Sequence, residues 1–166
     1  MSRFGLNAKK AAFLAALAEK PSLDGDGDRL TIGCKFNFAY FTTQAASQSF
    51  GDWTHPDLVS LLGKLKEYCK RPLSDWAITP VGKSGTVLAI YGGFPANSDL
   101  EFPKHVPHQA KWGRFRLESA VRLVGFVVPP EYTDKMHAKS GYRFDCNTFY
   151  VVFLDKNHAF YKTESK

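Results

Sequence analysis

An α+β fold is predicted for this chain of 166 residues: a small antiparallel sheet with helices packed on one face and a helical extension at the N-terminus. Two segments have the apolar spacing of amphipathic helices, and the second half contains short apolar and alternating runs that are typical of strands. The 14 Phe and 7 Tyr favour a sheet, because aromatic rings fill its half-buried surface. The length fits one domain, with a helix and turn over 1–28 and an α+β core over 29–166.

The first half of the chain supplies two predicted helices and one strand. A helix is expected over 6–19, and the proline and the glycine–aspartate repeat after it predict a turn over 21–28. Alternating apolar residues predict a strand over 31–41. Pro56 suits a helix start, and a second helix is expected over 56–70. Its apolar face consists of Leu58, Leu61, Leu62 and Leu65.

The second half is expected to contribute most of the sheet. Within the weakly patterned segment 77–110, residues 87–91 predict a short strand. Residues 112–117 and 121–128 predict two strands joined by a tight turn, and two prolines end the second of them. After a polar excursion, residues 148–154 are apolar on both faces. That pattern is typical of a central strand.

Composition limits the location and the partners of the protein. Cys34, Cys69 and Cys146 are too few and too widely spaced for a disulfide framework or a zinc site, which predicts reduced thiols in the cytoplasm. No apolar run approaches the ~20 residues of a membrane helix, so no membrane partner is expected. The net charge of +6 favours an anionic partner, which is nucleic acid, an acidic protein or a phospholipid surface, with solubility alone as the alternative.

Two short motifs fail as cofactor sites. The aspartates of 24–28 have the spacing of a calcium loop, but Arg29 and Lys35 stand where that loop needs glycine and glutamate. Residues 82–84 read Gly-Lys-Ser, but Ala77 occupies the place of the leading glycine of a phosphate loop. No cofactor is therefore expected.

The histidines of the proline-containing loop are also expected to hold no metal. His105 and His108 lie three residues apart, but Pro103 and Pro107 argue against a helix that would place them on one face. No third histidine stands at a supporting spacing, so a loop pair without metal is predicted.

One group of residues does predict a site. In the strand over 112–117, Trp112, Arg114 and Arg116 share a face, while the apolar residues at 115 and 117 turn to the core. Arg122 begins the next strand. Guanidinium groups crowded on neighbouring strands repel one another unless an anion lies among them, and their planar fork suits a phosphate.

The last strand carries a second polar group at its end. His158, Tyr161 and Lys162 follow directly, and a histidine titrates near neutral pH and can transfer protons. In the alternative interpretation Arg114 and Arg116 only pair with Glu118 or Glu131, and His158 only caps a turn.

Together these motifs resemble the RelE/YoeB-like ribonuclease toxins of the RelE/ParE superfamily. The order is W-x-R-x-R-L-x(4)-R-L-V-G-F, then a strand and H-x-x-Y. The residues that carry the resemblance are Trp112, Arg116, Leu117, Arg122, Leu123, Val124, His158 and Tyr161. It covers about 57–70 and 104–162.

The resemblance implies an endoribonuclease that cleaves messenger RNA without metal, typically on the ribosome, and that is neutralised by an antitoxin protein. It would place Arg116 and Arg122 at the scissile phosphate, His158 as general acid and Tyr161 beside the base. Further RNA contacts are expected from the basic and aromatic residues of the same segment. These are Lys104, Lys111, Trp112, Arg114 and Lys162.

The chain departs from this family in three ways. It is longer, with the N-terminal helix and an insertion at about 77–107. The carboxylate base of the YoeB-type enzymes has no clear counterpart, although Glu101 or Glu118 could serve. Two residues separate His158 from Tyr161, whereas the corresponding histidine and tyrosine are adjacent in the family members that this pattern resembles most. Because the superfamily includes members that act on gyrase, the alternative function is a non-enzymatic module that binds a protein such as a topoisomerase.

Overall fold

The computed structural model describes residues 7–18, 23, 29–118 and 121–162. The chain divides into two compact units, 1–31 and 32–166. In the first, helix α1 (Ala8–Ala18) confirms the expected N-terminal helix, while most of the turn predicted over 21–28 lies outside the described residues. None of the described helices combines the length and the apolar character that crossing a membrane requires.

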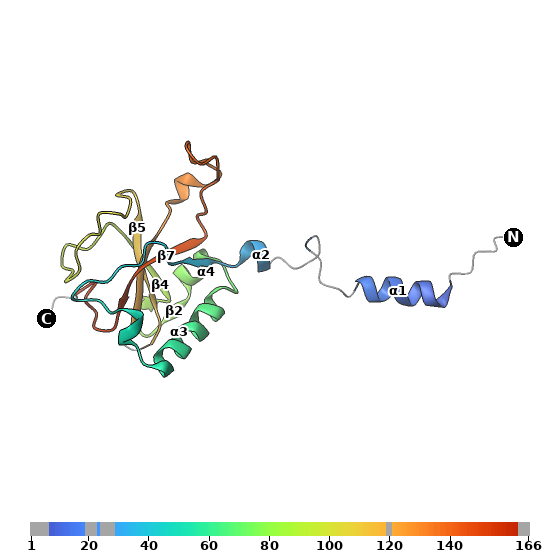
Figure 1. The fold of residues 1–166 in the computed structure, drawn as a ribbon, viewed down its shortest axis with the longest axis horizontal. Coiled ribbons are helices and arrows are strands. Elements are labelled where there is room, and N and C mark those ends of the chain that lie inside the picture. The colour runs from blue at the N-terminus through green and yellow to red at the C-terminus, as the bar shows by residue number, and fades with distance from the viewer. Residues whose placement is uncertain (1–6, 19–22, 24–28, 119–120, 163–166) are drawn as a thin grey trace. The chain divides into compact units, whose positions relative to one another are not determined.

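The second unit is built on a five-stranded sheet with the order β1-β7-β6-β5-β4. Figure 1 labels β4, β5 and β7 of this sheet. Its strands are β1 (Lys35–Asn37), β4 (Leu88–Gly92), β5 (Lys111–Arg116), β6 (Arg122–Val127) and β7 (Thr148–Asp155). Helices and this sheet confirm the α+β prediction. The sheet is mixed, however: β7, β6, β5 and β4 are antiparallel neighbours, but β1 lies parallel to β7. The prediction of a purely antiparallel sheet was therefore wrong at β1, because no hairpin constrains its direction.

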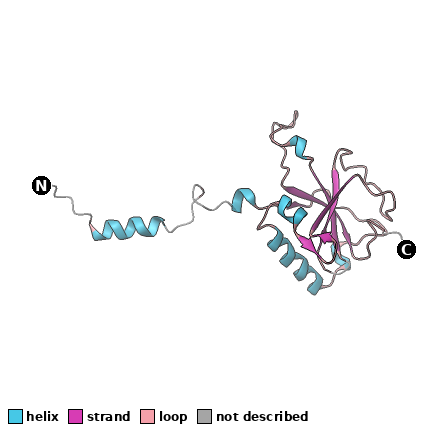
Figure 2. Cartoon of the chain, turned by 180° about the vertical axis from the view of Figure 1, so that it is seen from behind, coloured by secondary structure: helices cyan, strands magenta, loops and turns pink. Residues whose placement is uncertain are grey.

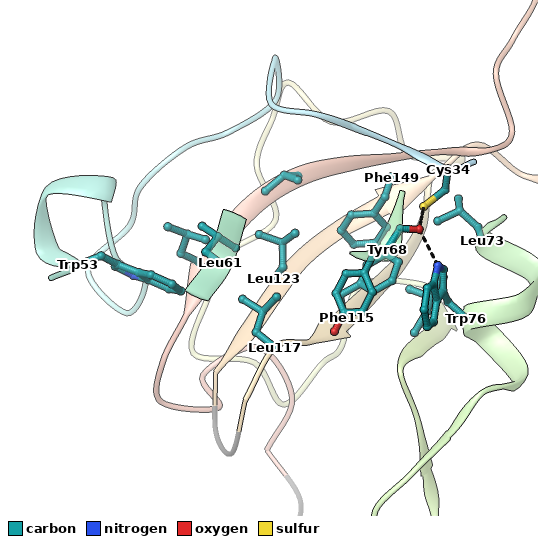
Figure 3. Close-up of a cluster of buried hydrophobic side chains, with 13 residues drawn as sticks. Cys34, Trp53, Leu61, Tyr68, Leu73, Trp76, Phe115, Leu117, Leu123 and Phe149 are labelled. Atoms are coloured by element: carbon teal, nitrogen blue, oxygen red, sulfur yellow. Dashed lines mark hydrogen bonds between the residues drawn. The ribbon is translucent and has the colours of Figure 1, made fainter. Parts of the chain in front are cut away.

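Both faces of the sheet carry buried side chains. In Figure 2 helices (cyan) and loops (pink) lie around the strands of the sheet (magenta). A first core cluster joins one face to two helices, α3 (His55–Tyr68) and α4 (Leu73–Ile78), through Leu61, Tyr68 and Trp76 (Figure 3). A second cluster covers the other face with loop residues such as Leu100 and Val106. Strand β7 lies between β1 and β6, and residues 151–154 are fully buried, which confirms its predicted central position.

Helix α3 begins at a capping box that its sequence encodes. The hydroxyl of Thr54 accepts a hydrogen bond from the backbone N–H of Asp57 (3.4 Å), and the Asp57 carboxylate accepts one in return from the backbone N–H of Thr54 (3.1 Å). Lys156, after β7, also bonds this carboxylate at 2.8 Å. Hydrogen bonds from Lys156 and Thr54 lower the pKa of Asp57 to about 2. The predicted helix over 56–70 is thereby confirmed.

The strand predicted over 31–41 is shorter than expected. Helix α2 (Arg29–Ile32) takes its first residues, and β1 has only three. The side chain of Asn37 ends the strand by accepting a hydrogen bond from the backbone N–H of Ala39 (2.8 Å), an Asx turn that competes with sheet pairing. Alternation therefore predicted the inward face correctly for Cys34, Phe36 and Phe38, which pack in the first cluster. It did not predict the length of the strand, and Ile32 is exposed while Tyr40 packs in the second cluster.

The segment between α3 and β4 contains elements that were not predicted. Helix α4 follows α3 almost at once, and a small hairpin of β2 (Pro80–Val81) and β3 (Gly85–Thr86) precedes β4. Both strands of the hairpin have two residues, too few for a periodic pattern to reveal them.

Two glycines offer a matched test of packing. A Cβ on Gly125 would lie 2.1 Å from the carbonyl oxygen of Tyr150, whereas one on Gly63, in the middle of α3, would meet nothing within 4 Å. We expect Gly125→Ala to lower the free energy of unfolding by about 1–3 kcal/mol through overpacking. Gly63→Ala should raise it by about 0.5–1 kcal/mol, because alanine favours a helix. Urea denaturation measures both, and equal effects at the two positions would contradict the packing described for β6 and β7.

Candidate phosphate-binding site

Three arginines share one face of the sheet at the adjoining ends of β5 and β6. Arg116 lies directly opposite Arg122, and Arg114 lies two residues before Arg116 on the same side of β5. Like charges that face each other across two strands are destabilising. The three guanidinium groups therefore make a local concentration of positive charge that a bound anion would relieve.

Arg122 is the buried member of the three, with 2% of its surface exposed. Its Nη1 donates to the carbonyl oxygens of Glu118 (3.0 Å) and Val121 (2.9 Å), and its Nη2 lies 3.4 Å from Nε2 of His158. Burial and, to a smaller extent, the positive charges of Arg114 and Arg116 lower the pKa of Arg122 to about 10. The guanidinium therefore stays charged at pH 7. The hydrogen bonds from Nη1 to the two carbonyl oxygens fix the orientation of the guanidinium plane without a ligand.

Asp155, to which no sequence motif points, organises the turn that carries His158. It lies opposite Arg122 on β7 and is 1% exposed. One carboxylate oxygen accepts the backbone N–H groups of Asn157 and Ala159 (both 3.0 Å), and the other accepts that of Phe160 (3.0 Å). Inside this turn His158 has a φ of 58°, a left-handed conformation that is uncommon for residues other than glycine. The hydrogen bonds of Asp155 hold it in place.

The imidazole of His158 is half-buried beside the arginines. Because a guanidinium can only donate, Nε2 of His158 accepts the hydrogen bond from Arg122. Burial lowers the pKa of His158 below its ordinary value of 6.5, and the positive charges of Arg122 and Arg114 lower it further. The negative charge of Asp155 acts in the opposite direction. Above that pKa the imidazole is neutral, and the tautomer that accepts from Arg122 at Nε2 carries its proton on Nδ1.

A pair of tyrosines completes the site. The rings of Tyr91 and Tyr161 stack with centroids 5.0 Å apart and an interplanar angle of 7°. The guanidinium carbon of Arg114 lies 5.6 Å from the centroid of the Tyr91 ring, within the range of a cation–π contact. Burial raises the pKa of Tyr91. Tyr91 ends an apolar strand without a motif around it, so the sequence alone did not point to it.

The β2–β3 hairpin packs directly on Arg116. A Cβ on Gly82 would lie 3.1 Å from Nη1 of Arg116, and one on Gly85 would lie 3.4 Å from its Nη2. Gly82 also has a φ of +66°, which a larger residue would adopt only under strain. The Gly-Lys-Ser turn that does not qualify as a nucleotide-binding loop is thus the part of the chain that closes over this arginine.

The structure brings together five of the residues that the sequence predicted. They are Arg114, Arg116, Arg122, His158 and Tyr161. In the alternative interpretation Arg114 and Arg116 only pair with Glu118 or Glu131. The carboxylate of Glu118 instead accepts a hydrogen bond from the hydroxyl of Ser60. Glu131 follows β6, at the end of the strand away from Arg122.

Four residues expected to bind RNA lie elsewhere. Trp112 is only 1% exposed and packs in the second cluster, so the prediction that it stacks on a base was wrong: loops bury that face of the sheet too. Lys111 begins β5, about 16 Å from Arg116 at ~3.3 Å per residue. Lys104 is exposed in the preceding loop, and Lys162 bonds Asp99 at 2.5 Å.

The site consists of phosphate-binding and proton-transferring groups. Within the part of the chain that the structure describes, no three His, Cys, Asp or Glu side chains gather closely enough to hold a metal ion. His105 instead bonds the carbonyl oxygen of Tyr40 at 3.0 Å. The chemistry available is therefore that of guanidinium groups, an imidazole and two stacked phenols.

Comparison with known proteins adds no relative. The chain matches no protein-family model, no curated protein and no solved structure.

Proposed function

We propose that this protein is a toxin-like endoribonuclease that cleaves messenger RNA in the cytoplasm, on the ribosome, without a metal ion. The observation that supports the proposal is the meeting of Arg114, Arg116 and Arg122 with His158 on one face of the sheet. A phosphodiester is the anion that such a group of planar, charged donors suits best.

In the proposed reaction the RNA supplies its own nucleophile. The 2′-hydroxyl attacks the adjacent phosphorus, the bond from phosphorus to the 5′-oxygen breaks, and the products are a 2′,3′-cyclic phosphate and a 5′-hydroxyl. Half-exposed Arg116 donates to the non-bridging oxygens, on which negative charge builds, and one such donor typically contributes ~2.7–4 kcal/mol. Arg122, which is 2% exposed, adds its positive charge from the neighbouring strand. Tyr161, held by Tyr91, supplies a flat surface for a base beside the cleaved bond.

Nε2 of His158 is proposed to take the proton of the 2′-hydroxyl, after RNA binding has released the long hydrogen bond (3.4 Å) that this nitrogen accepts from Arg122. Water protonates the departing 5′-oxygen. The resemblance assigns His158 the opposite role, that of the general acid. We prefer the base because burial and the neighbouring arginines lower the pKa of His158, which leaves the imidazole neutral at pH 7.

A second candidate is a module that binds a protein, as the topoisomerase-directed members of the superfamily do. An apolar groove of about 360 Å³ on α3 favours it. Leu62 and Phe50 line this groove with 64% and 39% of their surfaces exposed. Exposed apolar surface of this kind is typical of protein interfaces. An antitoxin bound there would be compatible with the nuclease proposal as well.

Regulated expression in a bacterial host separates the two candidates. We expect the wild type to arrest growth and to cleave messenger RNA, and the double variant Arg116→Lys/His158→Asn to do neither. Lysine keeps the charge but loses the bidentate fork, and asparagine tolerates the left-handed backbone at position 158.

The matched control is His108→Asn/Arg143→Lys, which makes the same substitutions at exposed positions away from the site and should behave as the wild type. Arrest with intact RNA would favour the protein-binding candidate. Equal cleavage by the wild type and the double variant would contradict the assigned residues.

A further inference from the structure

A second cleft lies beside Arg116, between the C-terminal part of α3, helix α4 and the flanks of the β2–β3 hairpin. Its volume of about 520 Å³ is within the range of ligand sites. The residues that matter for its chemistry are Lys64, Glu67, Arg71, Trp76, Arg116 and Glu118. Arg116 therefore belongs both to this cleft and to the arginine group described above.

Arg71 presents a flat guanidinium surface in this cleft. Its guanidinium carbon lies 3.7 Å from the centroid of the Trp76 ring, which places the charged group in contact with the ring face. Trp76 is itself 4% exposed, and its indole N–H donates to the carbonyl oxygen of Tyr68 at 2.8 Å (Figure 3). The carbonyl oxygen of Arg71 also accepts the backbone N–H of Cys34 at 3.0 Å. The buried, hydrogen-bonded ring of Trp76 thus orients the guanidinium of Arg71, a residue that is exposed.

The charges of the cleft favour an anion. Lys64, Arg71 and Arg116 are the cations of its lining, and Glu67 and Glu118 are the acids. Glu67 bonds Lys70 at 2.5 Å, and Glu118 accepts a hydrogen bond from Ser60, so each carboxylate is directed to a partner outside the cleft lining. A ligand with a planar ring and a phosphate matches both the flat guanidinium and the surplus of positive charge.

We propose that this cleft binds the nucleotide next to the cleaved phosphate of a single-stranded RNA. Its base stacks on the outer face of the Arg71 guanidinium, and Arg116 stands between this nucleotide and the scissile phosphate. Bases of single-stranded RNA commonly stack on arginine planes. The inference rests on the proposed ribonuclease function and adds to it a base-stacking subsite built from α3 and α4.

Binding of a short RNA that cannot be cleaved tests this subsite without reference to catalysis. The probe carries 2′-O-methyl groups, which remove the nucleophile, and in a series of probes one base at a time is replaced by an abasic residue. For the wild type we expect one abasic position to weaken binding about tenfold in fluorescence anisotropy at fixed salt.

Arg71→Lys, which keeps the charge but not the plane, should bind the intact probe about tenfold more weakly than the wild type and should lose nothing further at that abasic position. The control Lys66→Ala removes an exposed cation of α3 outside the cleft and should retain the abasic penalty.

The outcomes separate this inference from the function on which it rests. If the wild type binds and cleaves RNA but Arg71→Lys keeps both the affinity and the abasic penalty, the subsite is wrong and the ribonuclease proposal stands. If the wild type neither binds nor cleaves RNA, both are wrong.

Discussion

Replacement of Asp155 by alanine is expected to lower the free energy of unfolding by about 3–5 kcal/mol, the largest effect on stability that we predict for a single side chain. The carboxylate is 1% exposed and accepts three backbone N–H groups of the turn over 157–160. It also faces buried Arg122 across β6 and β7. The substitution therefore leaves buried donors unsatisfied and removes a negative charge from beside a buried positive one.

Urea denaturation measures this loss, and Asp99→Ala is the control. Asp99 pairs with Lys162 at the surface, where an ion pair contributes at most about 1 kcal/mol. Asp155→Asn keeps the shape of the side chain and should still lose about 1–3 kcal/mol, because an amide cannot accept from both sides. Equal stability of Asp155→Ala and Asp99→Ala would contradict the structural role given to Asp155.

The second large effect concerns RNA cleavage. His158→Asn should lower kcat by about 10²–10⁴-fold, the range that proton transfer by a positioned side chain typically contributes. Asparagine suits the backbone φ of 58° and should leave the turn and the stability unchanged. Single-turnover cleavage of an RNA oligonucleotide is the measurement, with His108→Asn, in an exposed loop, as the control. A fall of less than threefold would contradict a role for His158 in proton transfer.

The pH dependence of the same reaction tests the direction of that transfer. A general base acts in its neutral form, which is present above its pKa. Because the pKa of His158 lies below 6.5, kcat/KM should stay level from neutral pH upward and should fall only on acidification below that pKa. The acid limb should disappear in His158→Asn. A wild-type rate that instead decreases as the pH rises above 6.5 would identify His158 as the general acid.

Part of the candidate site was predictable because it lies on elements with a strong local pattern. Alternation placed Arg114 and Arg116 on one face of β5, and the tight turn after it brought Arg122 onto the neighbouring strand. The run of apolar residues in β7 indicated a central strand, which carries His158 to the same end of the sheet. Periodicity encodes the face of each residue, and short turns decide which strands are neighbours.

Other features depended on contacts that no local pattern encodes. Trp112 alternates with the two arginines, yet it is buried while they are half-exposed, because the loops before β5 cover only part of that face. Tyr91 reaches the site from β4, and Asp155 acts through the backbone of a turn rather than through a motif.

The sequence by itself determined the α+β class, the main helix, the positions of all five strands of the sheet and the grouping of arginines with His158. Only the tertiary structure decided the parallel direction of β1, the stacking of Tyr91 on Tyr161, the hairpin that packs on Arg116 and the Arg71–Trp76 contact. The physical reason is one of range. Hydrophobic periodicity and capping act within a few residues of the chain. The contacts listed here form only when separate elements pack against one another, so the packing of the whole unit selects them.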